Sequence, residues 1–371
     1  MLSKNDKTKI LLVIYGDIHF GGVSVLLNNL LDNMDRSDFE FTLYAFGNIT
    51  DEEMFKAYAD KGVRVIIGLK EKYNKIKYAK DLAGILRLDR YDIIHINTGA
   101  LGMTALTLKI SKLLGVKTRI AHSHSSFPSD YVYSNCQKKS QRKNNRLATV
   151  KVACSKEAAA HLFGNTEAII LKNGIDSKRF SFSGDMRSII RTKLGVKDRL
   201  VIGTVGRLEP VKNQAFILEI AKEMSVKRDV SVLIVGSGSL KNDLVECASK
   251  LGIRENVIFV EANDRVEDYL NAMDVFLLPS RSEGLGISAI EAQSMDLPTW
   301  CSLGVPTLAS VTEKVHFMDL AEGPEKWCES ILQSLEGVDL ESRSERRMSV
   351  REKGYDIEAS AKVLEELYKA R

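Results

Sequence analysis

Two series of short, strongly apolar segments run along this chain, and longer amphipathic segments separate their members. The first series lies at residues 9–15, 39–46, 63–67, 93–97, 119–122 and 149–154. The second series lies at residues 200–205, 230–235, 257–260 and 275–278. Apolar runs of this length are typical of parallel strands buried on both faces, and their alternation with helical segments predicts βαβ units. The pattern therefore predicts an α/β fold of two Rossmann-like domains facing a deep cleft, with ligands at the carboxyl ends of the strands.

The stretch between the two series, residues 176–199, is polar and strongly charged, and we expect the domain boundary there. A chain of 371 residues suits two domains, because single domains usually contain about 100–200 residues. We place the boundary after residue 184, so that the two domains are residues 1–184 and 185–352. A further helix is predicted at residues 357–369.

The net charge of +4 hides an uneven distribution of charge. Residues 1–184 contain 28 basic and 18 acidic residues, whereas residues 185–371 contain 25 basic and 31 acidic residues. The basic excess is greatest in residues 101–156, where eleven basic residues accompany one acidic residue, Asp130. Such a basic half favours an anionic partner such as a membrane surface, although a solvated charged face would give the same counts. Nucleic acid is disfavoured, because no known reading module is present and the second half is acidic.

The cysteines and the apolar segments indicate the compartment. Five cysteines are widely spread and form no C-x-x-C pair, which disfavours a disulfide framework and a zinc site. The first apolar run, residues 10–15, is too short for a signal-peptide core, and no run reaches about 18 apolar residues. We therefore expect a cytoplasmic protein with reduced thiols, which would meet a membrane only at its surface.

A pair of glycines, Gly21 and Gly22, lies between the first predicted strand and the helix that follows it. Glycines there allow a ligand to approach the backbone, and the N–H groups at a helix start attract anions. The segment lacks the G-x-G-x-x-G spacing of dinucleotide-binding proteins, which disfavours NAD. A plain tight turn fits the glycine pair as well as a phosphate loop does.

Two cations flank Pro210 directly after the first strand of the second series. Arg207 and Lys212 are five residues apart across this turn, so both can converge on one anion. A diphosphate would suit the pair, with a planar fork from arginine and a point charge from lysine. Two solvated surface cations remain the alternative.

Two glutamates lie beside a glycine-containing helix start at the end of the second series. Glu283 is in the loop after the strand at residues 275–278, and Glu291 lies eight residues later in the predicted helix. Carboxylates accept strong hydrogen bonds from hydroxyl groups, while helix-start N–H groups hold phosphates. The combination suits a nucleotide sugar, although the E-x7-E spacing alone is common by chance.

Together these segments resemble the large retaining glycosyltransferase family that includes bacterial capsular and exopolysaccharide enzymes, which have the GT-B fold and the E-x7-E motif. The resemblance covers most of the chain in the expected order. Besides the segments above, it rests on residues 92–97, 119–124, 153–155, 172–176, 274–280 and 354–356.

The resemblance implies roles for residues of the second domain, which would bind the donor. Glu291 would bind the ribose hydroxyls of the nucleotide, and Glu283 would hold the donor sugar near its 3- and 4-hydroxyls. Arg207 and Lys212 would neutralise the diphosphate leaving group. The remaining donor contacts would come from the helix start and the base-reading loop, at Gly284, Leu285, Gly286, Arg265 and Val266.

The first domain, residues 1–184, would bind the acceptor, and residues 353–371 would form a C-terminal helix that packs back on it. The resemblance places Gly22 against the donor phosphates and His124 near the transferring sugar, as a catalytic residue with Glu283, Arg207 and Lys212. His19, near the glycine pair, is a candidate acceptor contact. His122 is another, because it shares a strand face with His124.

The chain departs from the family pattern in two places. Asp296 stands where the family usually has glycine at a helix end, and aspartate can adopt the left-handed conformation that such an end requires. Thr307 and Leu308 follow Pro306 where the family often has an acidic residue. These departures weaken any inference about which sugar is transferred.

The expected reaction is sugar transfer from a nucleotide sugar, with UDP as the preferred nucleotide, to a lipid-linked or oligosaccharide acceptor. No Asp-x-Asp motif is present, so we expect neither a metal nor a cofactor. The basic first domain would bind an anionic membrane surface at the inner face of the cell membrane. Two alternatives stay open, namely a GT-B-fold epimerase of UDP-GlcNAc and a non-catalytic subunit that binds sugar nucleotides.

Overall fold

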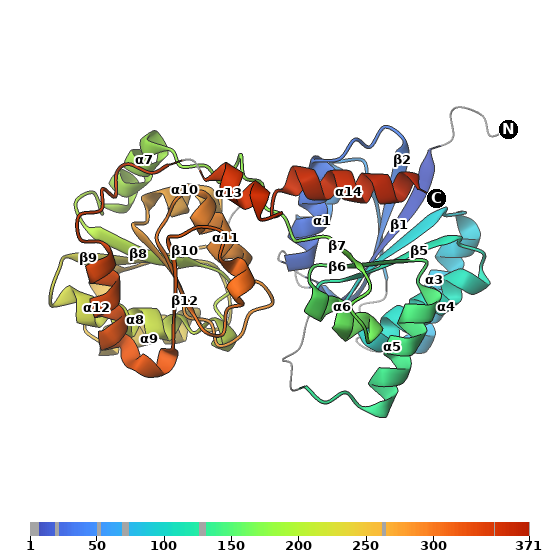
Figure 1. Ribbon diagram of the computed structural model, residues 1–371, viewed down its shortest axis with the longest axis horizontal. Coiled ribbons are helices and arrows are strands. Elements are labelled where there is room, and N and C mark those ends of the chain that lie inside the picture. The colour runs from blue at the N-terminus through green and yellow to red at the C-terminus, as the bar shows by residue number, and fades with distance from the viewer. Residues whose placement is uncertain are drawn as a thin grey trace. The chain divides into compact units, whose positions relative to one another are not determined.

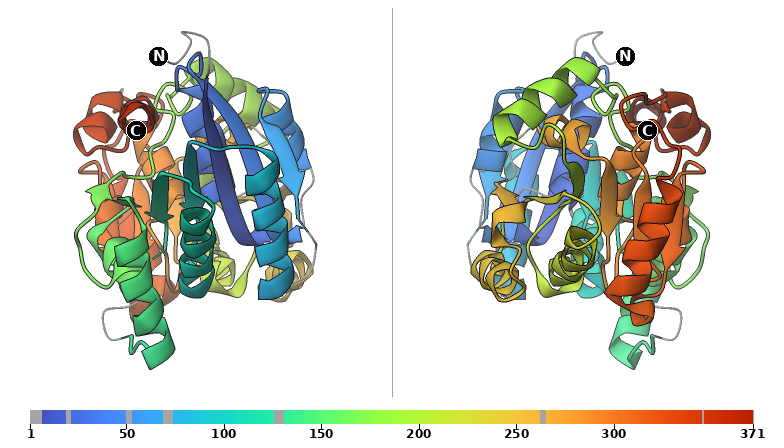
Figure 2. Two further views of the ribbon diagram at one scale, coloured as in Figure 1. Left: turned by 90° about the vertical axis from the view of Figure 1, so that its right-hand side faces the viewer. Right: turned by 90° about the vertical axis from the view of Figure 1, so that its left-hand side faces the viewer.

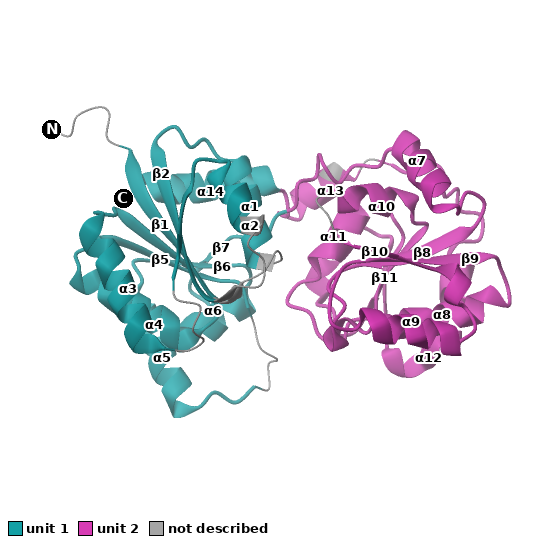
Figure 3. Cartoon of the chain, turned by 180° about the vertical axis from the view of Figure 1, so that it is seen from behind, with its two compact units in different colours: residues 1–174, 357–371 teal, residues 175–356 magenta. Residues whose placement is uncertain are grey.

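The protein folds into two compact units (Figure 3). The structure is a computed structural model that describes residues 7–18, 22–49, 53–68, 74–125, 131–261, 265–344 and 346–370. Unit 1 comprises Met1–Gly174 and Ile357–Arg371, and unit 2 comprises Ile175–Asp356. Unit 2 is therefore inserted in the sequence of unit 1.

Unit 1 is built on a parallel seven-stranded sheet with the order β3-β2-β1-β4-β5-β6-β7. Its strands are β1 (Thr8–Ile18), β2 (Phe39–Ile49), β3 (Arg64–Ile67), β4 (Ile93–Asn97), β5 (Thr118–Ser123), β6 (Val150–Ala153) and β7 (Ile169–Ile170). Every residue of β4 is buried, because helices cover both faces of the sheet.

Two layers of helices enclose this sheet (Figure 1). One face is covered by α1 (Gly22–Asp32), α2 (Glu53–Ala59) and α14 (Ile357–Lys369). The other face is covered by α3 (Lys75–Leu88), α4 (Leu101–Leu113), α5 (Asn135–Leu147) and α6 (Lys156–Phe163). Because α14 belongs to this core, the residues after Asp356 return to unit 1, as the fold prediction requires.

Unit 2 repeats the architecture with a parallel six-stranded sheet in the order β10-β9-β8-β11-β12-β13. Its strands are β8 (Leu200–Val205), β9 (Val230–Val235), β10 (Val257–Val260), β11 (Val275–Leu278), β12 (Thr299–Ser302) and β13 (Val315–Met318). One face packs against α7 (Gly184–Leu194), α10 (Val266–Ala272), α11 (Ile287–Ser294) and α13 (Arg347–Glu352). The other packs against α8 (Gln214–Ser225), α9 (Lys241–Lys250) and α12 (Gly323–Ser334). Figure 2 shows these layers with each unit in turn nearest the viewer.

Four short 3-10 helices complete unit 2. They are η1 (Pro210–Lys212), η2 (Arg254–Asn256), η3 (Thr307–Ala309) and η4 (Leu320–Glu322). Within the described ranges of both units, no helix combines the length and the apolar composition needed to cross a membrane.

The strand order reverses direction at one point in each sheet, between β1 and β4 in unit 1 and between β8 and β11 in unit 2. In open α/β sheets, ligands bind outside the carboxyl ends of the strands at such a switch point. In unit 2 this place is flanked by the loops after Val205 and Leu278, which carry Lys212 and Glu283.

The predicted α/β class with two Rossmann-like domains is confirmed, but the division of the chain differs from the expected one. The boundary in the sequence lies between Gly174 and Ile175 rather than after residue 184. Residues 175–183 belong to unit 2 because Ile175 N donates to Tyr355 O (2.8 Å) and Phe180 lies in the core of unit 2. The return to unit 1 comes after Asp356 rather than at residue 353.

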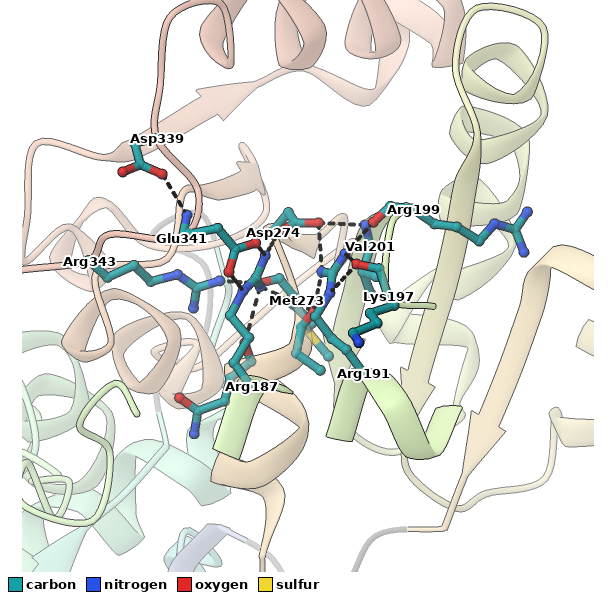
Figure 4. Close-up of polar contacts among 12 residues, drawn as sticks. Arg187, Arg191, Lys197, Arg199, Val201, Met273, Asp274, Asp339, Glu341 and Arg343 are labelled. Carbon is teal, nitrogen blue, oxygen red and sulfur yellow. Dashed lines mark hydrogen bonds and ion pairs between the residues drawn. The ribbon is translucent and has the colours of Figure 1, made fainter. Parts of the chain in front are cut away.

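A buried network of ion pairs lies at the amino end of β11, the end opposite the switch-point loops (Figure 4). Asp274, 2% exposed, pairs with Arg187 (2.6 Å) and Arg191 (3.1 Å) of α7 and accepts from Val201 N (2.8 Å). Glu341 pairs with the same Arg187 at 2.7 Å. The network joins α7, two central strands and the segment after α12, so it stabilises unit 2 rather than its ligand site.

Candidate active site

The loops after β8 and β9 are joined by backbone contacts that allow no side chain between them. Gly206 N donates to Val235 O (3.0 Å), and Leu208 N donates to Ser237 O (2.9 Å). A Cβ atom on Gly236 would lie 1.9 Å from Gly206 O, so only glycine fits at residue 236. This close approach fixes the start of the segment that carries Arg207 and Lys212.

Lys212 and Glu283 meet at the switch point of unit 2. Lys212 Nζ lies 2.6 Å from Glu283 Oε1, and Ser280 Oγ donates to the same oxygen at 2.6 Å. The Lys212 side chain is 19% exposed and that of Glu283 is 10% exposed, so the pair is largely shielded from water. The prediction that both residues belong to one site is consistent with this contact.

Backbone hydrogen bonds hold the loop that carries Glu283. Arg281 N donates to Val211 O (2.8 Å), and Glu283 N donates to Gly304 O (3.0 Å). A Cβ atom on Gly304 would lie 2.5 Å from Ser280 O, so the loop after β12 packs directly on this segment. The carboxylate is therefore presented by a loop whose backbone is attached to two neighbouring loops.

Arg207 differs from Lys212 in that its side chain is exposed. Within the described part of the chain its guanidinium has no ion pair, while its carbonyl accepts from Gln214 Nε2 at 2.7 Å. The backbone of Arg207 is thus fixed and its charge is free to bind an anion. The structure does not itself bring this guanidinium to Glu283.

The start of α11 directly follows Glu283. Gly284 is exposed, Leu285 is partly buried, and Gly286 is buried with a left-handed φ of 82°. A Cβ atom on Gly286 would lie 2.9 Å from Val305 Cγ1, so both the backbone angle and the space require glycine. The first N–H groups of a helix lack intrahelical partners and favour an anion; here Ala289 N already donates to Gly286 O (2.9 Å), which leaves those of Ile287 and Ser288 for this role.

Glu291 lies inside α11 and is partly buried. Burial raises the pKa of Glu291 to about 7. The positive charge of Arg179 opposes this shift, and the negative charge of Glu267 reinforces it. Arg179 and Glu267 pair with each other at 2.7 Å. Sequence reasoning missed both residues, although Arg179 lies three residues after the 172–176 segment and Glu267 directly follows the predicted base-reading loop.

The predicted base-reading residues lie at the start of α10. Arg265 is exposed and its Nε lies 2.8 Å from Asp268, while Val266 begins the helix and is partly buried. The preceding residues 262–264 lie outside the described residues. Contact of Arg265 and Val266 with a base therefore stays a prediction.

Asp296 has the left-handed conformation proposed for it from the sequence, with φ 56°. Its carboxylate accepts from Lys314 Nζ (2.9 Å), Ser344 N (2.8 Å) and Arg346 Nε (2.8 Å). These partners hold its pKa below the usual range against the opposing effect of burial. The aspartate therefore attaches the segment around residue 344 to the end of α11, which a glycine could not do.

Unit 1 places three histidines together near the carboxyl ends of β4 and β5. The His122 and His124 ring centroids are 3.9 Å apart, and His95 Nε2 lies 3.2 Å from His122 Nδ1. Burial lowers the pKa of His124 to about 4 and that of His95 to about 3, and it lowers the pKa of His122 well below its usual value. All three rings are therefore neutral at pH 7.

Of the histidines predicted to lie near the acceptor or the transferring sugar, the structure describes His122 and His124. His124 is partly exposed, whereas His122 is fully buried and packs on His124 instead of facing solvent. An acceptor contact by His122 itself therefore has no exposed surface to use. His19 lies outside the described residues, and Gly22 begins α1.

The basic residues predicted to face an anionic partner gather on α5. This helix begins with a capping box between Ser134 and Gln137 and buries only Gln141, Asn144 and Leu147. Its exposed face carries Lys138, Lys139, Arg142, Lys143 and Arg146. These cations have no ion pair with any described carboxylate, so their charge is uncompensated.

No cluster of three or more histidine, cysteine, aspartate or glutamate side chains with the arrangement of a metal site occurs among the described residues.

Family models match both halves of the chain. The model described as Glycosyltransferase Family 4 matches residues 20–179, and that described as Glycosyl transferases group 1 matches residues 186–316. The putative glycosyltransferase EpsF of Bacillus subtilis is 26% identical, covering 98% of this chain and 97% of that protein.

A second relative and a solved structure agree with these matches. The UDP-Gal:alpha-D-GlcNAc-diphosphoundecaprenol alpha-1,3-galactosyltransferase of Escherichia coli is 30% identical over 74% of this chain and 74% of that protein. The crystal structure of HepE from Anabaena in complex with UDP covers 98% of this chain and 100% of that chain, with a TM-score of 0.79 and 17% identity. The chain therefore belongs to the bacterial glycosyltransferases with the GT-B fold.

Proposed function

We propose that this glycosyltransferase is a retaining, metal-independent enzyme that transfers a sugar from a UDP-sugar to a hydroxyl of a glycan or lipid-linked acceptor. The Lys212–Glu283 pair carries the proposal, because it places a cation and a carboxylate at the switch point of unit 2. The named relatives, which include an enzyme that uses UDP-Gal and a diphosphoundecaprenol-linked acceptor, support a role in surface polysaccharide or glycolipid synthesis.

Each charged group of unit 2 has a distinct part in donor binding. Lys212 and Arg207 would neutralise the diphosphate, together with the N–H groups at the start of α11. Glu283 would accept hydrogen bonds from sugar hydroxyls, and Glu291 from the ribose. Because Lys212 already pairs with Glu283, phosphate and sugar would be bound on either side of one buried ion pair.

The chemical step breaks the bond between the anomeric carbon and the diphosphate oxygen, whose electron pair leaves with UDP. The acceptor hydroxyl forms the new bond from the same face, and its proton passes to the departing phosphate. Lys212 and Arg207 stabilise the charge that develops on the leaving group, which is the largest electrostatic demand of such a reaction. This role needs no metal ion.

A UDP-release assay with a panel of UDP-sugars, with and without lipid-linked acceptors, tests the proposal. We expect Glu283→Ala to lower kcat/KM about 100-fold, since it removes a carboxylate that binds the reacting sugar. The matched control is Glu261→Ala, whose side chain is 76% exposed and pairs with Lys241. Full activity of Glu283→Ala would contradict the assigned site.

Three readouts separate the alternatives. NMR of the product anomer distinguishes retention from inversion. Interconversion of a UDP-sugar without an acceptor would instead identify an epimerase. UDP binding without turnover on any acceptor would indicate a non-catalytic subunit.

We further propose that the exposed face of α5 binds anionic lipid at the cytoplasmic membrane surface. Val132, which lies three residues before the start of α5 in the sequence, is 84% exposed. Replacing Lys139 and Lys143 by glutamine should weaken binding to phosphatidylglycerol vesicles about 30-fold, since each near-surface cation contributes about 1 kcal/mol. Co-sedimentation measures this, with Lys250→Gln and Lys326→Gln in unit 2 as the charge-matched control. Binding that is indifferent to salt and lipid charge would contradict the proposal.

A further inference from the structure

A row of three buried aromatic side chains, Tyr368 of α14, His95 and His122, leads to the partly buried His124 in unit 1. The Tyr368 hydroxyl lies 2.7 Å from His95 Nδ1, and His95 Nε2 lies 3.2 Å from His122 Nδ1. The ring of His122 packs on that of His124 with centroids 3.9 Å apart. Tyr368 is 1% exposed, and both His95 and His122 are 0% exposed. Nothing in the proposed donor chemistry accounts for such a row.

Asn97 determines which nitrogen of His124 carries the proton. Asn97 Nδ2 donates to His95 O (3.3 Å), so its Oδ1 is the atom that lies 2.9 Å from His124 Nε2. An amide oxygen can only accept, so His124 Nε2 must carry a hydrogen. Because burial keeps the pKa of His124 at about 4, the ring is neutral at pH 7 and Nδ1 is an unprotonated acceptor.

The direction of hydrogen bonding along the row follows from the same reasoning. Burial raises the pKa of Tyr368, which therefore keeps its hydroxyl proton and can donate it to His95 Nδ1. His95 then donates from Nε2 to His122 Nδ1, which leaves the proton of His122 on Nε2. The opposite direction would leave both the Tyr368 hydroxyl hydrogen and a His122 lone pair unpaired.

The row ends in two complementary atoms. His122 Nε2 and His124 Nδ1 are buried and without a well-aligned hydrogen bond in the described part of the chain, and the side chain of Asn173 lies close enough to interact with His124. The first is a donor and the second an acceptor, on rings that pack together. Buried polar atoms without partners are rare and require an explanation.

We propose that Tyr368, His95 and His122 are positioning residues that fix the orientation of the His124 ring, whose Nε2–H tautomer is set by Asn97 and whose Nδ1 is the acceptor nitrogen. The hydroxyl of Tyr368 sets the tautomer of His95, His95 sets that of His122, and His122 fixes the ring of His124 by packing. The helix α14 thereby contributes to the site without contacting a substrate. The effect on catalysis rests on the proposed function, whereas the tautomer does not.

Two-bond proton–nitrogen NMR of the histidine side chains in the full chain tests the row, with Tyr368→Phe as the variant. Phenylalanine keeps the ring packing against Phe39 and Phe41 and removes only the hydroxyl. The matched control is Tyr58→Phe, because Tyr58 is equally buried in the same core and donates to Ser24 O at 2.7 Å.

The expected wild-type spectrum shows His124 as a neutral Nε2–H ring from pH 5 to pH 8. Tyr368→Phe should shift the ring nitrogens of His95, His122 and His124, and Tyr58→Phe should leave all three unchanged. An Nδ1–H tautomer for His124, or unshifted His122 and His124 signals in Tyr368→Phe, would overturn the proposal.

A second pair of variants replaces the centre of the row. His95→Gln keeps a group that can accept from Tyr368 and donate to His122, whereas His95→Leu does not. The His124 signals should stay closer to wild type in His95→Gln, and equal disturbance in both variants would count against the row.

Donor hydrolysis measured with UDP-glucose gives the catalytic consequence. Tyr368→Phe should lower kcat about fivefold with little change in KM, while Tyr58→Phe keeps both. An unchanged kcat together with shifted NMR signals would overturn the catalytic part. Absence of turnover in the wild type with every UDP-sugar and acceptor would contradict the proposed function and leave the NMR result to decide the row.

Discussion

The two units have the same central strand order, yet they solve the problem of buried polar groups in opposite ways. Unit 2 buries charges in compensated pairs, Lys212 with Glu283 at the switch point and Asp274 with two arginines at the other end of β11. Unit 1 places three histidines beside one another, with no carboxylate partner among the residues that the structure describes, and keeps them neutral.

Under the proposed function, this difference would let one fold serve two kinds of ligand group. A neutral imidazole row suits hydroxyl groups, because it offers hydrogen bonds without attracting ions. A largely shielded ion pair, with an exposed arginine on the same loop segment as its lysine, suits a diphosphate, because cationic groups are already in place where anionic charge must be bound. The contrast lies in the loops and side chains, since the sheets are alike.

The first test of this comparison is to lower the pH, which should change the stability of the two units differently. The unfolded chain protonates its histidines below about pH 6.5, whereas folded His124 and His95 do so only below about 4 and 3. Unfolding therefore takes up protons, and unit 1 should lose about 1.4 kcal/mol of stability per pH unit for each buried histidine as pH falls from 6.5.

Unit 2 should change little over the same range. Glu291 has a folded pKa of about 7 against 4.5 unfolded, so its effect on the stability of unit 2 is favourable as pH falls through this window. The lowered pKa of His316 acts in the opposite direction. Hydrogen exchange resolved by unit measures both slopes, and equal slopes would contradict the comparison.

The second way is to remove a compensating charge. Asp274→Ala leaves Arg187 and Arg191 buried with less compensation and should lower the free energy of unfolding of unit 2 by about 3–5 kcal/mol. Asp229→Ala is the control, because that 71% exposed side chain pairs with Arg199 and should cost less than about 1 kcal/mol. Denaturant unfolding followed by hydrogen exchange checks both, and a similar small loss in the two variants would show that the network is not important for stability.

The third test concerns how the buried lysine of unit 2 contributes to binding the diphosphate of the donor. Lys212→Ala should lower kcat/KM for UDP release about 100-fold, because the diphosphate loses a shielded cation. Lys241→Ala, whose ammonium group pairs with exposed Glu261, should keep the wild-type value. If both lysines matter equally, the effect is one of overall charge and not of the buried pair.

The smallest expected effect sharpens the role of Glu291. Ribose hydroxyls donate to its carboxylate, so UDP binding favours the ionised form and should strengthen about tenfold from pH 6 to pH 8, around the pKa of about 7. Glu291→Gln should bind UDP with an affinity that is flat over this range. Calorimetry at three pH values measures it, and a slope that persists in Glu291→Gln would assign the titration to another group.

Much of this architecture could be predicted from the sequence because parallel strands buried on both faces are continuous apolar runs. The strands at residues 93–97, 200–205 and 275–278 were expected within the bounds observed. Three strands were missed. β12 has the mixed sequence Thr-Trp-Cys-Ser and β13 contains His316, so neither forms a continuous apolar run, and β7 is only two residues long.

The site was partly predictable for a similar reason. Lys212 and Glu283 were found because each follows a strand that ends at the switch point. Arg179 and Glu267 were missed because their proximity to Glu291 depends on packing between α10, α11 and the chain after Ile175. The bonding partners of His95 could not be predicted either, since Tyr368 lies 273 residues away in the sequence.

The insertion of unit 2 into unit 1 has a consequence for the order in which the protein is made. Domains generally fold as units while the chain emerges from the ribosome. Unit 2 is one continuous segment that ends at Asp356, so all of it is available before α14 has been synthesised. Unit 1, although it begins first, lacks α14, one of the three helices that cover one face of its sheet, until then. The neutral imidazole row is thus completed late, when Tyr368 arrives, and the two halves of the enzyme should mature in the reverse of their order in the gene.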